Sequence, residues 1–140
     1  MGRSSNVTAA GKNDGRIIRD RLEQLLTNAY APYSKFRVAA AVVDENDAIH
    51  YGVNVENQSL SVTTCAEAGA ISALHTAGGK RIKRLYLFSA PNIKVVPCGA
   101  CRQRLAEFGD PEMLVVTFGD NGEELALTLG ELFPHGFRFK

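Results

Sequence analysis

Two apolar runs rich in β-branched residues, 36–43 and 48–55, lie close together and are separated only by turn-forming residues at 44–47. This arrangement predicts a β-hairpin, in which neighbouring strands pair antiparallel. Apolar residues at helical spacing precede the hairpin from Asp14 to the neighbourhood of Pro32, and predicted helices and strands alternate after it. The order of elements therefore predicts an α/β domain with a mixed sheet and helices on its faces.

The segments after the hairpin have clear helix and strand patterns. They predict helices over 65–75, 98–108 and 127–133 and strands over 84–89 and 113–118. Small side chains dominate one face of the first of these helices, at Ala66, Ala70 and Ala73. We expect this helix to pack closely on the sheet, because small side chains let the two backbones approach.

The length and composition are sufficient for one folded domain. Of the 140 residues, 45% are hydrophobic, which supplies a core for a chain of this size. Residues 1–13 carry hardly any large apolar side chain, so we expect a flexible tail before a single domain over residues 14–140. No apolar run approaches the ~20 residues of a membrane helix and no secretory leader opens the chain, so we expect a cytoplasmic protein without a membrane partner.

The charge of the chain is nearly balanced, which argues against a dedicated nucleic-acid binder. There are 16 Lys and Arg against 15 Asp and Glu, a formal net charge of +1. The basic cluster at residues 80–84 could contact phosphate groups, but such a run is more often a solvated loop that enters a strand. No run of aromatic residues accompanies it, and we expect no nucleic-acid partner.

The three cysteines, Cys65, Cys98 and Cys101, are candidates for a metal site. Their odd number excludes a fully paired disulfide framework. Cys98 and Cys101 have the C-x-x-C spacing that presents two thiolates to one ion, and Cys65 would complete the three protein ligands of a catalytic zinc site. Glu67 follows Cys65 by two residues, where a carboxylate near the open coordination position could shuttle protons.

Two other interpretations of the cysteines stay open at this point. The C-x-x-C pair could be a redox pair or half of a structural zinc site, with Cys65 a small buried apolar residue. A redox pair does not require Cys65 and Glu67, however, and a structural zinc site usually has a fourth protein ligand. We expect His50, His75 and His135 to be ordinary histidines that do not bind metal.

The cysteine segments belong to a longer pattern. Cys65-Ala66-Glu67 is followed by Pro97-Cys98-Gly99-Ala100-Cys101, and the pattern extends to residues 31–36, 54–57 and 132–137. In this order the segments resemble the small zinc-dependent cytidine deaminases of the three-cysteine type. The resemblance implies a three-layer α/β/α cytidine deaminase-like fold with a mixed five-stranded sheet. It also implies a homotetramer with shared active sites and one Zn²⁺ per subunit, which deaminates cytidine or deoxycytidine in pyrimidine salvage.

The resemblance implies a role for each matching residue. Cys65, Cys98 and Cys101 would hold zinc, and Glu67 would move protons from the attacking water to the pyrimidine ring and then to the leaving amine. Phe36 would stack on the base, and the backbone of Ala66 would also contact the base. Asn54 and Glu56 would bind the ribose 3′-hydroxyl. Phe137 of a neighbouring subunit would close the pocket. Without the resemblance, we would interpret Phe36 as a core residue and Phe137 as an ordinary apolar residue near the C-terminus. Asn54 and Glu56 would be interpreted as the exposed polar face of a strand.

Several positions depart from the family pattern. Ala68 stands where three-cysteine deaminases typically have an arginine that offsets the net charge of three thiolates and Zn²⁺. Our hypothesis is that Arg102 or Arg104 supplies this charge, with helix N–H groups as the alternative. Gln58 and Leu60 stand where the family usually has a small residue and a tyrosine, near the sugar.

These departures leave two alternative functions. The chain could deaminate a modified cytosine nucleoside such as a blasticidin-type antibiotic, or it could be an inactive zinc-binding relative. The run Asn54-Val55-Glu56-Asn57 favours an ordinary ribose. Glu67 argues against an inactive relative, since zinc binding and folding do not need this carboxylate.

Overall fold

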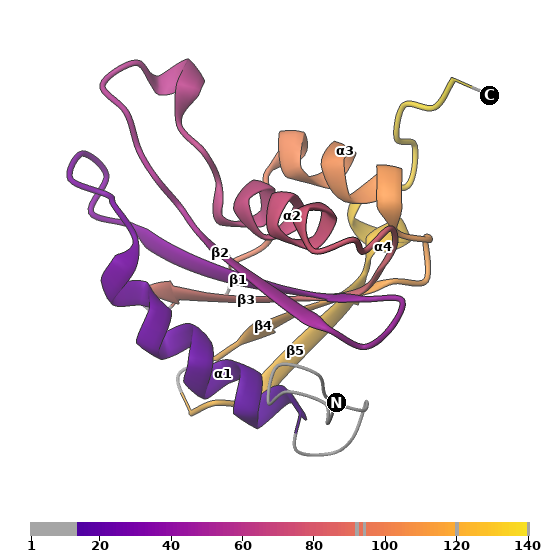
Figure 1. Cartoon of the computed structure of the whole chain (residues 1–140), viewed down its shortest axis with the longest axis horizontal. Coiled ribbons are helices and arrows are strands. Elements are labelled where there is room, and N and C mark those ends of the chain that lie inside the picture. Colours follow the sequence, from indigo (N-terminus) through magenta and orange to yellow (C-terminus); the bar gives the residue numbers. More distant parts are fainter. Residues whose placement is uncertain (1–13, 92, 94, 120, 140) are drawn as a thin grey trace.

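A mixed five-stranded sheet forms the middle layer of the fold (Figure 1). The structure is a computed structural model that describes residues 14–91, 93, 95–119 and 121–139, so the tail expected over residues 1–13 lies outside the described residues. The strands are β1 Arg37–Asp44, β2 Ile49–Val53, β3 Ile82–Ala90, β4 Leu114–Phe118 and β5 Glu124–Thr128, in the spatial order β2-β1-β3-β4-β5. β1 pairs antiparallel with β2 and β3, β3 parallel with β4, and β4 antiparallel with β5, which confirms the predicted hairpin and mixed sheet.

Helices cover both faces of this sheet. α1 (Asp14–Leu25) packs on one face against β1 and β3, whereas α2 (Ala66–Thr76), α3 (Gly99–Phe108) and the short α4 (Leu129–Leu132) lie on the other (Figure 1). α1 ends earlier than predicted and is followed by a 3₁₀ turn at Leu26–Asn28. The three-layer α/β/α fold is confirmed. Among the described helices, none is both long and apolar enough to span a membrane.

β1 is buried on both faces, which accounts for its uninterrupted apolar sequence. Val38, Ala40 and Val42 belong to the core on the side of α2 and α3. Ala39 and Ala41, which alternate with them, belong to the core on the side of α1. The strand is therefore fixed in the centre of the fold, and the residues at its start are held in a defined position.

The C-terminal part of the chain differs from the prediction of a helix over 127–133. Strand β5 occupies Glu124–Thr128, and only the short helix α4 follows it. Glu, Leu and Ala are good helix formers, so the sequence of β5 gives no strand signal, and pairing with β4 decides its conformation. Thr128 then begins α4 with a capping box, in which its side chain accepts a hydrogen bond from the N–H of Glu131.

Close packing of α2 on the sheet is confirmed, and it depends on a residue that the sequence analysis did not single out. Ala66 and Ala70 are buried on the face of α2 that contacts β2. Opposite them on β2 stands Gly52, where an added methyl group would overlap the carbonyl oxygen of Ala66 and the backbone nitrogen of Ala70. Only a glycine permits this approach, which fixes the start of α2 against the sheet.

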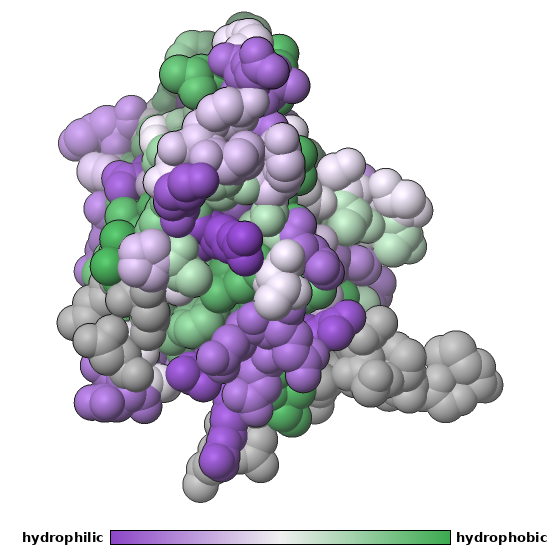
Figure 2. All heavy atoms as spheres, turned by 90° about the vertical axis from the view of Figure 1, so that its left-hand side faces the viewer, coloured by the Kyte–Doolittle hydropathy of each residue, from purple (hydrophilic) through white to green (hydrophobic). Residues whose placement is uncertain are grey.

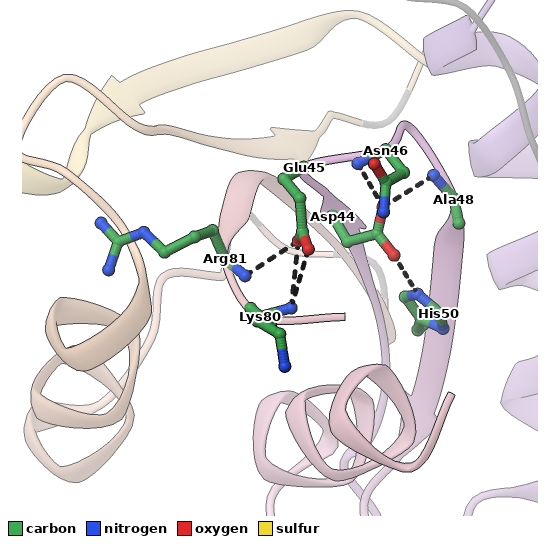
Figure 3. Close-up of polar contacts among 7 residues, drawn as sticks. All are labelled: Asp44, Glu45, Asn46, Ala48, His50, Lys80 and Arg81. Carbon is green, nitrogen blue, oxygen red and sulfur yellow. Dashed lines mark hydrogen bonds and ion pairs between the residues drawn. The ribbon is translucent and has the colours of Figure 1, made fainter. Parts of the chain in front are cut away.

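Asp44 organises the turn between β1 and β2 (Figure 3). Its Oδ1 accepts hydrogen bonds from the backbone N–H groups of Asn46, at 2.8 Å, and Ala48, at 3.0 Å. Its Oδ2 lies 2.8 Å from Nε2 of His50. His50 therefore has a structural partner in the hairpin.

Glu45 joins this turn to the connection between α2 and β3 (Figure 3). Its carboxylate accepts hydrogen bonds from the backbone N–H groups of Lys80, at 3.0 Å, and Arg81, at 2.9 Å. These bonds lower the pKa of Glu45 to about 2. The guanidinium of Arg81 is in turn paired with Asp110 at 2.9 Å. The basic cluster 80–84 thus has structural contacts, which favours the interpretation as a loop that enters a strand.

Candidate active site

The three cysteine side chains meet where two helices begin. Cys65 is the residue immediately before α2, Cys98 the residue immediately before α3, and Cys101 lies in the first turn of α3. Their Sγ atoms all lie within 4.8 Å of one another. Helix starts offer unpaired N–H groups that stabilise thiolates. The backbone N–H groups of Cys101 and Ala100 lower the pKa of Cys98, whereas burial raises the pKa of Cys65 and of Cys101.

The donor set fits a zinc ion of the catalytic kind. Sulfur ligands of tetrahedral zinc lie roughly 3.8 Å apart, given Zn–S bonds of about 2.3 Å, and the thiol spacing here is compatible with that geometry. Among the described residues, the cluster comprises these three cysteines and no fourth histidine, cysteine or carboxylate. Three ligands leave one position for a reactant, whereas structural sites usually have four. The meeting of Cys65 with the C-x-x-C pair also argues against an isolated redox pair.

Glu67 lies beside this cluster and is buried, with an exposed fraction of 6%. It stands in the first turn of α2, two residues after Cys65. Burial raises the pKa of its carboxyl group above the usual range, although the positive charge of Arg104 opposes the shift. A buried carboxyl group with raised proton affinity, next to an open metal position, can accept a proton and return it.

A cavity of about 220 Å³ adjoins the cluster. Its walls combine reactive groups with apolar side chains and are formed by Phe36, Val38, Asn54, Thr63, Cys65, Ala66, Glu67, Val95, Val96 and Cys98. The structure therefore brings Phe36, Asn54 and Ala66 together with the thiols and Glu67, as the resemblance implied. Sequence reasoning did not find Val38, Thr63 or Val95, because nothing in their local patterns distinguishes them from core or loop residues.

Asn54 faces the cavity while its amide is bonded to β1. Its Oδ1 accepts a hydrogen bond from the N–H of Val38 at 2.9 Å, and its Nδ2 donates one to the carbonyl oxygen of Phe36 at 2.8 Å. An amide nitrogen has two hydrogens, and among the described residues the carbonyl oxygen of Phe36 accepts one of them, so the second can bind a ligand. The side chain thus fixes the start of β1 and can still bind a hydroxyl group.

Neither Glu56 nor Phe137 lines this cavity as a single chain forms it. Glu56 contacts the loop before β1, where its Oε1 accepts hydrogen bonds from the N–H groups of Tyr33 and Ser34. Phe137 is 67% exposed and packs against Phe139, with ring centroids 5.6 Å apart. The implied contacts of Glu56 with ribose and of Phe137 with a neighbouring subunit's pocket stay predictions.

The two candidate arginines differ in what they contact. Arg102 donates hydrogen bonds to the carbonyl oxygens of Pro97, at 2.7 Å, and Leu132, at 2.6 Å. Its guanidinium thereby joins the entry to α3 with the end of α4. Arg104 instead lies 3.5 Å from Sγ of Cys101, through Nη1. The geometry therefore favours Arg104 as the group that offsets the charge of the thiolates.

Comparison with known proteins agrees with the site. Residues 16–117 match the family model described as the cytidine and deoxycytidylate deaminase zinc-binding region, a stretch that includes Glu67 and the cysteines. The chain belongs to this family. A cytidine deaminase of Mycobacterium tuberculosis is 36% identical over 124 residues, which cover 89% of this chain and 90% of that protein. The resemblance inferred from the sequence is confirmed.

Solved structures of the family share the fold. The crystal structure of a cytidine deaminase from Burkholderia pseudomallei matches with a TM-score of 0.79 and 32% identity, covering 87% of this chain and 98% of that chain. The crystal structure of the Mycobacterium tuberculosis cytidine deaminase matches with a TM-score of 0.77 and 35% identity, covering 90% and 98%. The layers that position the cysteines are thus a family property.

Proposed function

We propose that the protein is a zinc-dependent cytidine deaminase, which hydrolyses cytidine and deoxycytidine to uridine or deoxyuridine and ammonia. The observation that carries this proposal is a cavity in which Glu67 lies beside three clustered thiols. Three thiolate ligands would leave the fourth coordination position of a tetrahedral zinc ion for a reactant. The family match and the cytidine deaminases that resemble the chain over most of its length support the same reaction.

In this proposal Cys65, Cys98 and Cys101 hold the zinc ion through Sγ. Zinc, when bound, supplies Lewis acidity that lowers the pKa of water and makes a nucleophile available at neutral pH. Glu67 takes the proton released by the attacking water and delivers it to the pyrimidine ring nitrogen. It then takes the proton of the hydroxyl group that has added to C4 and passes it to the exocyclic amine, so that the C4–N bond breaks, ammonia leaves and the carbonyl group of the product forms.

The walls of the cavity suit a pyrimidine nucleoside. Phe36 offers an aromatic face for the base, and the backbone of Ala66 lies at the start of α2, next to Glu67. Asn54 has one amide N–H for a sugar hydroxyl, which would discriminate against ligands that lack this group.

The departures from the family pattern do not favour a modified nucleoside. Leu60 is 78% exposed, and neither Gln58 nor Leu60 lines the cavity of its own chain. Within one chain the cavity is therefore lined by Phe36, Asn54 and Thr63, and Gln58 or Leu60 would approach a bound nucleoside only from a neighbouring subunit. Unmodified cytidine and deoxycytidine are the expected substrates.

Assembly into a homotetramer with shared active sites is part of the proposal, as are a cytoplasmic location and a role in pyrimidine salvage. Exposed apolar side chains support self-association, among them Leu60, Val62 and Phe137, which are 78%, 60% and 67% exposed. The segment with Leu60 and Val62 projects from the fold (Figure 1), and hydrophobic atoms lie beside hydrophilic ones at the top of the face in Figure 2. Light scattering on the purified protein measures the number of subunits.

The test of the proposed function is the loss of cytidine absorbance with zinc-loaded protein. Glu67→Gln, prepared identically, should retain zinc and lose about 10²- to 10⁴-fold in turnover, the usual contribution of a general acid and base. Glu107→Gln, which changes an exposed carboxylate, is the matched control and should keep wild-type turnover. Absence of turnover in wild-type protein with one zinc per chain would refute the proposal.

A further inference from the structure

The connection from β3 to α3 carries part of the cavity wall. Val95 and Val96 line the cavity together with Glu67, and Cys98 follows three residues after Val95. Between Ala90 and Cys98 the described residues form neither helix nor strand. Backbone groups in such a segment must find partners outside regular secondary structure. The position of this wall therefore depends on the side chains that bind the backbone of the connection.

Two buried hydroxyl groups hold this connection. The Ser89 hydroxyl donates a hydrogen bond to the carbonyl oxygen of Pro91 at 2.9 Å and accepts one from the N–H of Ile93 at 3.3 Å. Oγ1 of Thr117 accepts a hydrogen bond from the N–H of Val95 at 3.2 Å. Ser89 and Thr117 are only 1% and 2% exposed. Water cannot readily replace the partners of side chains buried so deeply, so these bonds fix the course of the connection.

Both hydroxyl groups come from the ends of neighbouring parallel strands. β3 pairs with β4 in parallel, and Leu87 lies opposite Thr117. Leu87 and Val115 belong to the core on the side of α2 and α3. Since side chains alternate along a strand, Ser89 and Thr117 point to this same side, on which the cysteines lie. Ligands of α/β folds usually bind at the carboxyl ends of parallel strands, so these two side chains stand at a functional edge of the sheet.

We propose that Thr117 and Ser89 are positioning residues, which hold the connection from β3 to α3 so that Val95 forms a wall against the base of the substrate. This inference rests on the proposed function, because it assigns the cavity to a nucleoside. Thr117 binds the wall residue directly, whereas Ser89 fixes the residues that precede it. Neither Ser89 nor Thr117 lines the cavity, so both act on the substrate through Val95.

Thr117→Val removes the hydroxyl group and keeps the shape of the side chain. It should raise the KM for cytidine about fivefold or more, because the N–H of Val95 loses its partner and the wall shifts. The change in kcat should be smaller. Thr117→Ser, which keeps the hydroxyl, should restore KM, and Ser89→Ala should raise it as Thr117→Val does. In a Val95→Ala background, Thr117→Val should raise KM no further.

Cobalt distinguishes positioning of the wall from positioning of the metal ligands. Co²⁺ bound in place of zinc has visible absorption bands that depend on its ligands and their geometry. These bands should be the same in wild type and in Thr117→Val, because the effect is confined to the wall. Altered bands or loss of metal would overturn the inference, since Thr117 would then act on Cys98. An unchanged KM in Thr117→Val, or an equal increase with and without Val95→Ala, would overturn it as well.

Thr76→Val is the matched control. It removes an exposed hydroxyl at the end of α2, which donates a hydrogen bond to the carbonyl oxygen of Ser72 at 2.8 Å, and it should keep wild-type KM. Thermal unfolding of each variant excludes a folding defect. Calorimetry separates this inference from the proposed function, since zinc-loaded Glu67→Gln binds cytidine without converting it and Thr117→Val should weaken that binding by the same factor. Absence of turnover in the wild-type protein would refute the proposed function, whereas binding that Thr117→Val does not affect would refute the inference alone.

Discussion

The guanidinium of Arg104 contacts the sulfur of Cys101, with Nη1 3.5 Å from Sγ. Both residues lie on α3, three positions apart, so they share one helix face. Three thiolates and Zn²⁺ sum to a charge of −1, and Glu67 adds another negative charge when ionised. A cation at Cys101 lowers the electrostatic cost of gathering these groups in a partly buried site.

Replacement of Arg104 should weaken zinc binding. We expect Arg104→Gln to lower zinc affinity by about tenfold or more, in the range found for residues that contact metal ligands. Competition with a chromophoric chelator measures this directly, without reference to turnover. Arg81→Gln, which removes an exposed arginine paired with Asp110, should leave zinc affinity unchanged. Unchanged affinity in both Arg104→Gln and Arg102→Gln would mean that neither guanidinium offsets the thiolates.

Gly52→Ala should destabilise the fold, because the methyl group meets the backbone of α2 rather than a flexible side chain. We expect a loss of about 1–3 kcal/mol in the free energy of unfolding, as for overpacked sites. Gly69 lies on α2, on the other side of the same contact. A Cβ atom added there by Gly69→Ala would lie 3.5 Å from the Cα of Gly52, an ordinary van der Waals distance. It should be tolerated, since alanine also favours the helix. Urea unfolding compares the two variants, and equal losses would contradict this account of the contact.

Glu45 should give the hairpin a stability that depends on pH. Its pKa is lowered from 4.5 to about 2 in the folded protein. The ionised form is thus favoured by folding, so its contribution is complete above pH 4.5 and is lost as the pH falls toward 2. Glu45→Gln should therefore be less stable than wild type at pH 7, and the difference should shrink at pH 3. Urea unfolding at both values tests this, with Glu112→Gln as the control for removal of an exposed charge. A difference independent of pH would exclude the carboxylate as its source.

Shared active sites predict that two defective variants complement each other. Glu67→Gln and Phe137→Ala should each have low turnover, but mixed oligomers form some sites with both residues intact, about one in four after random exchange. Activity should therefore rise after subunits are exchanged. Glu67→Gln mixed with Cys101→Ser is the control. One subunit supplies both residues to a site, so every site in the mixture has one of the two defects and activity should not rise. Equal behaviour of the two mixtures would show that Phe137 does not act in a neighbouring subunit.

The metal site was predictable because its parts are local in sequence. Cys65 and Glu67 begin one helix, Cys98 and Cys101 begin another, and helix starts can be recognised from caps and spacing. Only the meeting of the two helices was not evident from spacing. The resemblance to the deaminases supplied that step, and the thiol distances agree with it.

Features that depend on contacts between distant segments were not predictable. The role of Gly52 follows from the approach of α2 to β2, and nothing in the sequence around Gly52 indicates it. The bonds from Glu56 to Ser34 join segments 22 residues apart and satisfy irregular backbone, which has no periodic signal. β5 was missed for a related reason: its residues favour a helix, and only the neighbouring strand makes them extended.

The hollow between α2 and α3 has an evolutionary consequence. It is lined by Ala68 from one helix and by Arg104 from the other. A cation can therefore enter the same space from either helix, and the small side chain of Ala68 leaves it free for Arg104. Relatives with arginine at the position of Ala68 are expected to carry a neutral residue at that of Arg104. The double change Ala68→Arg with Arg104→Gln should then restore zinc affinity, so a charge essential to the site need not be inherited at a fixed position.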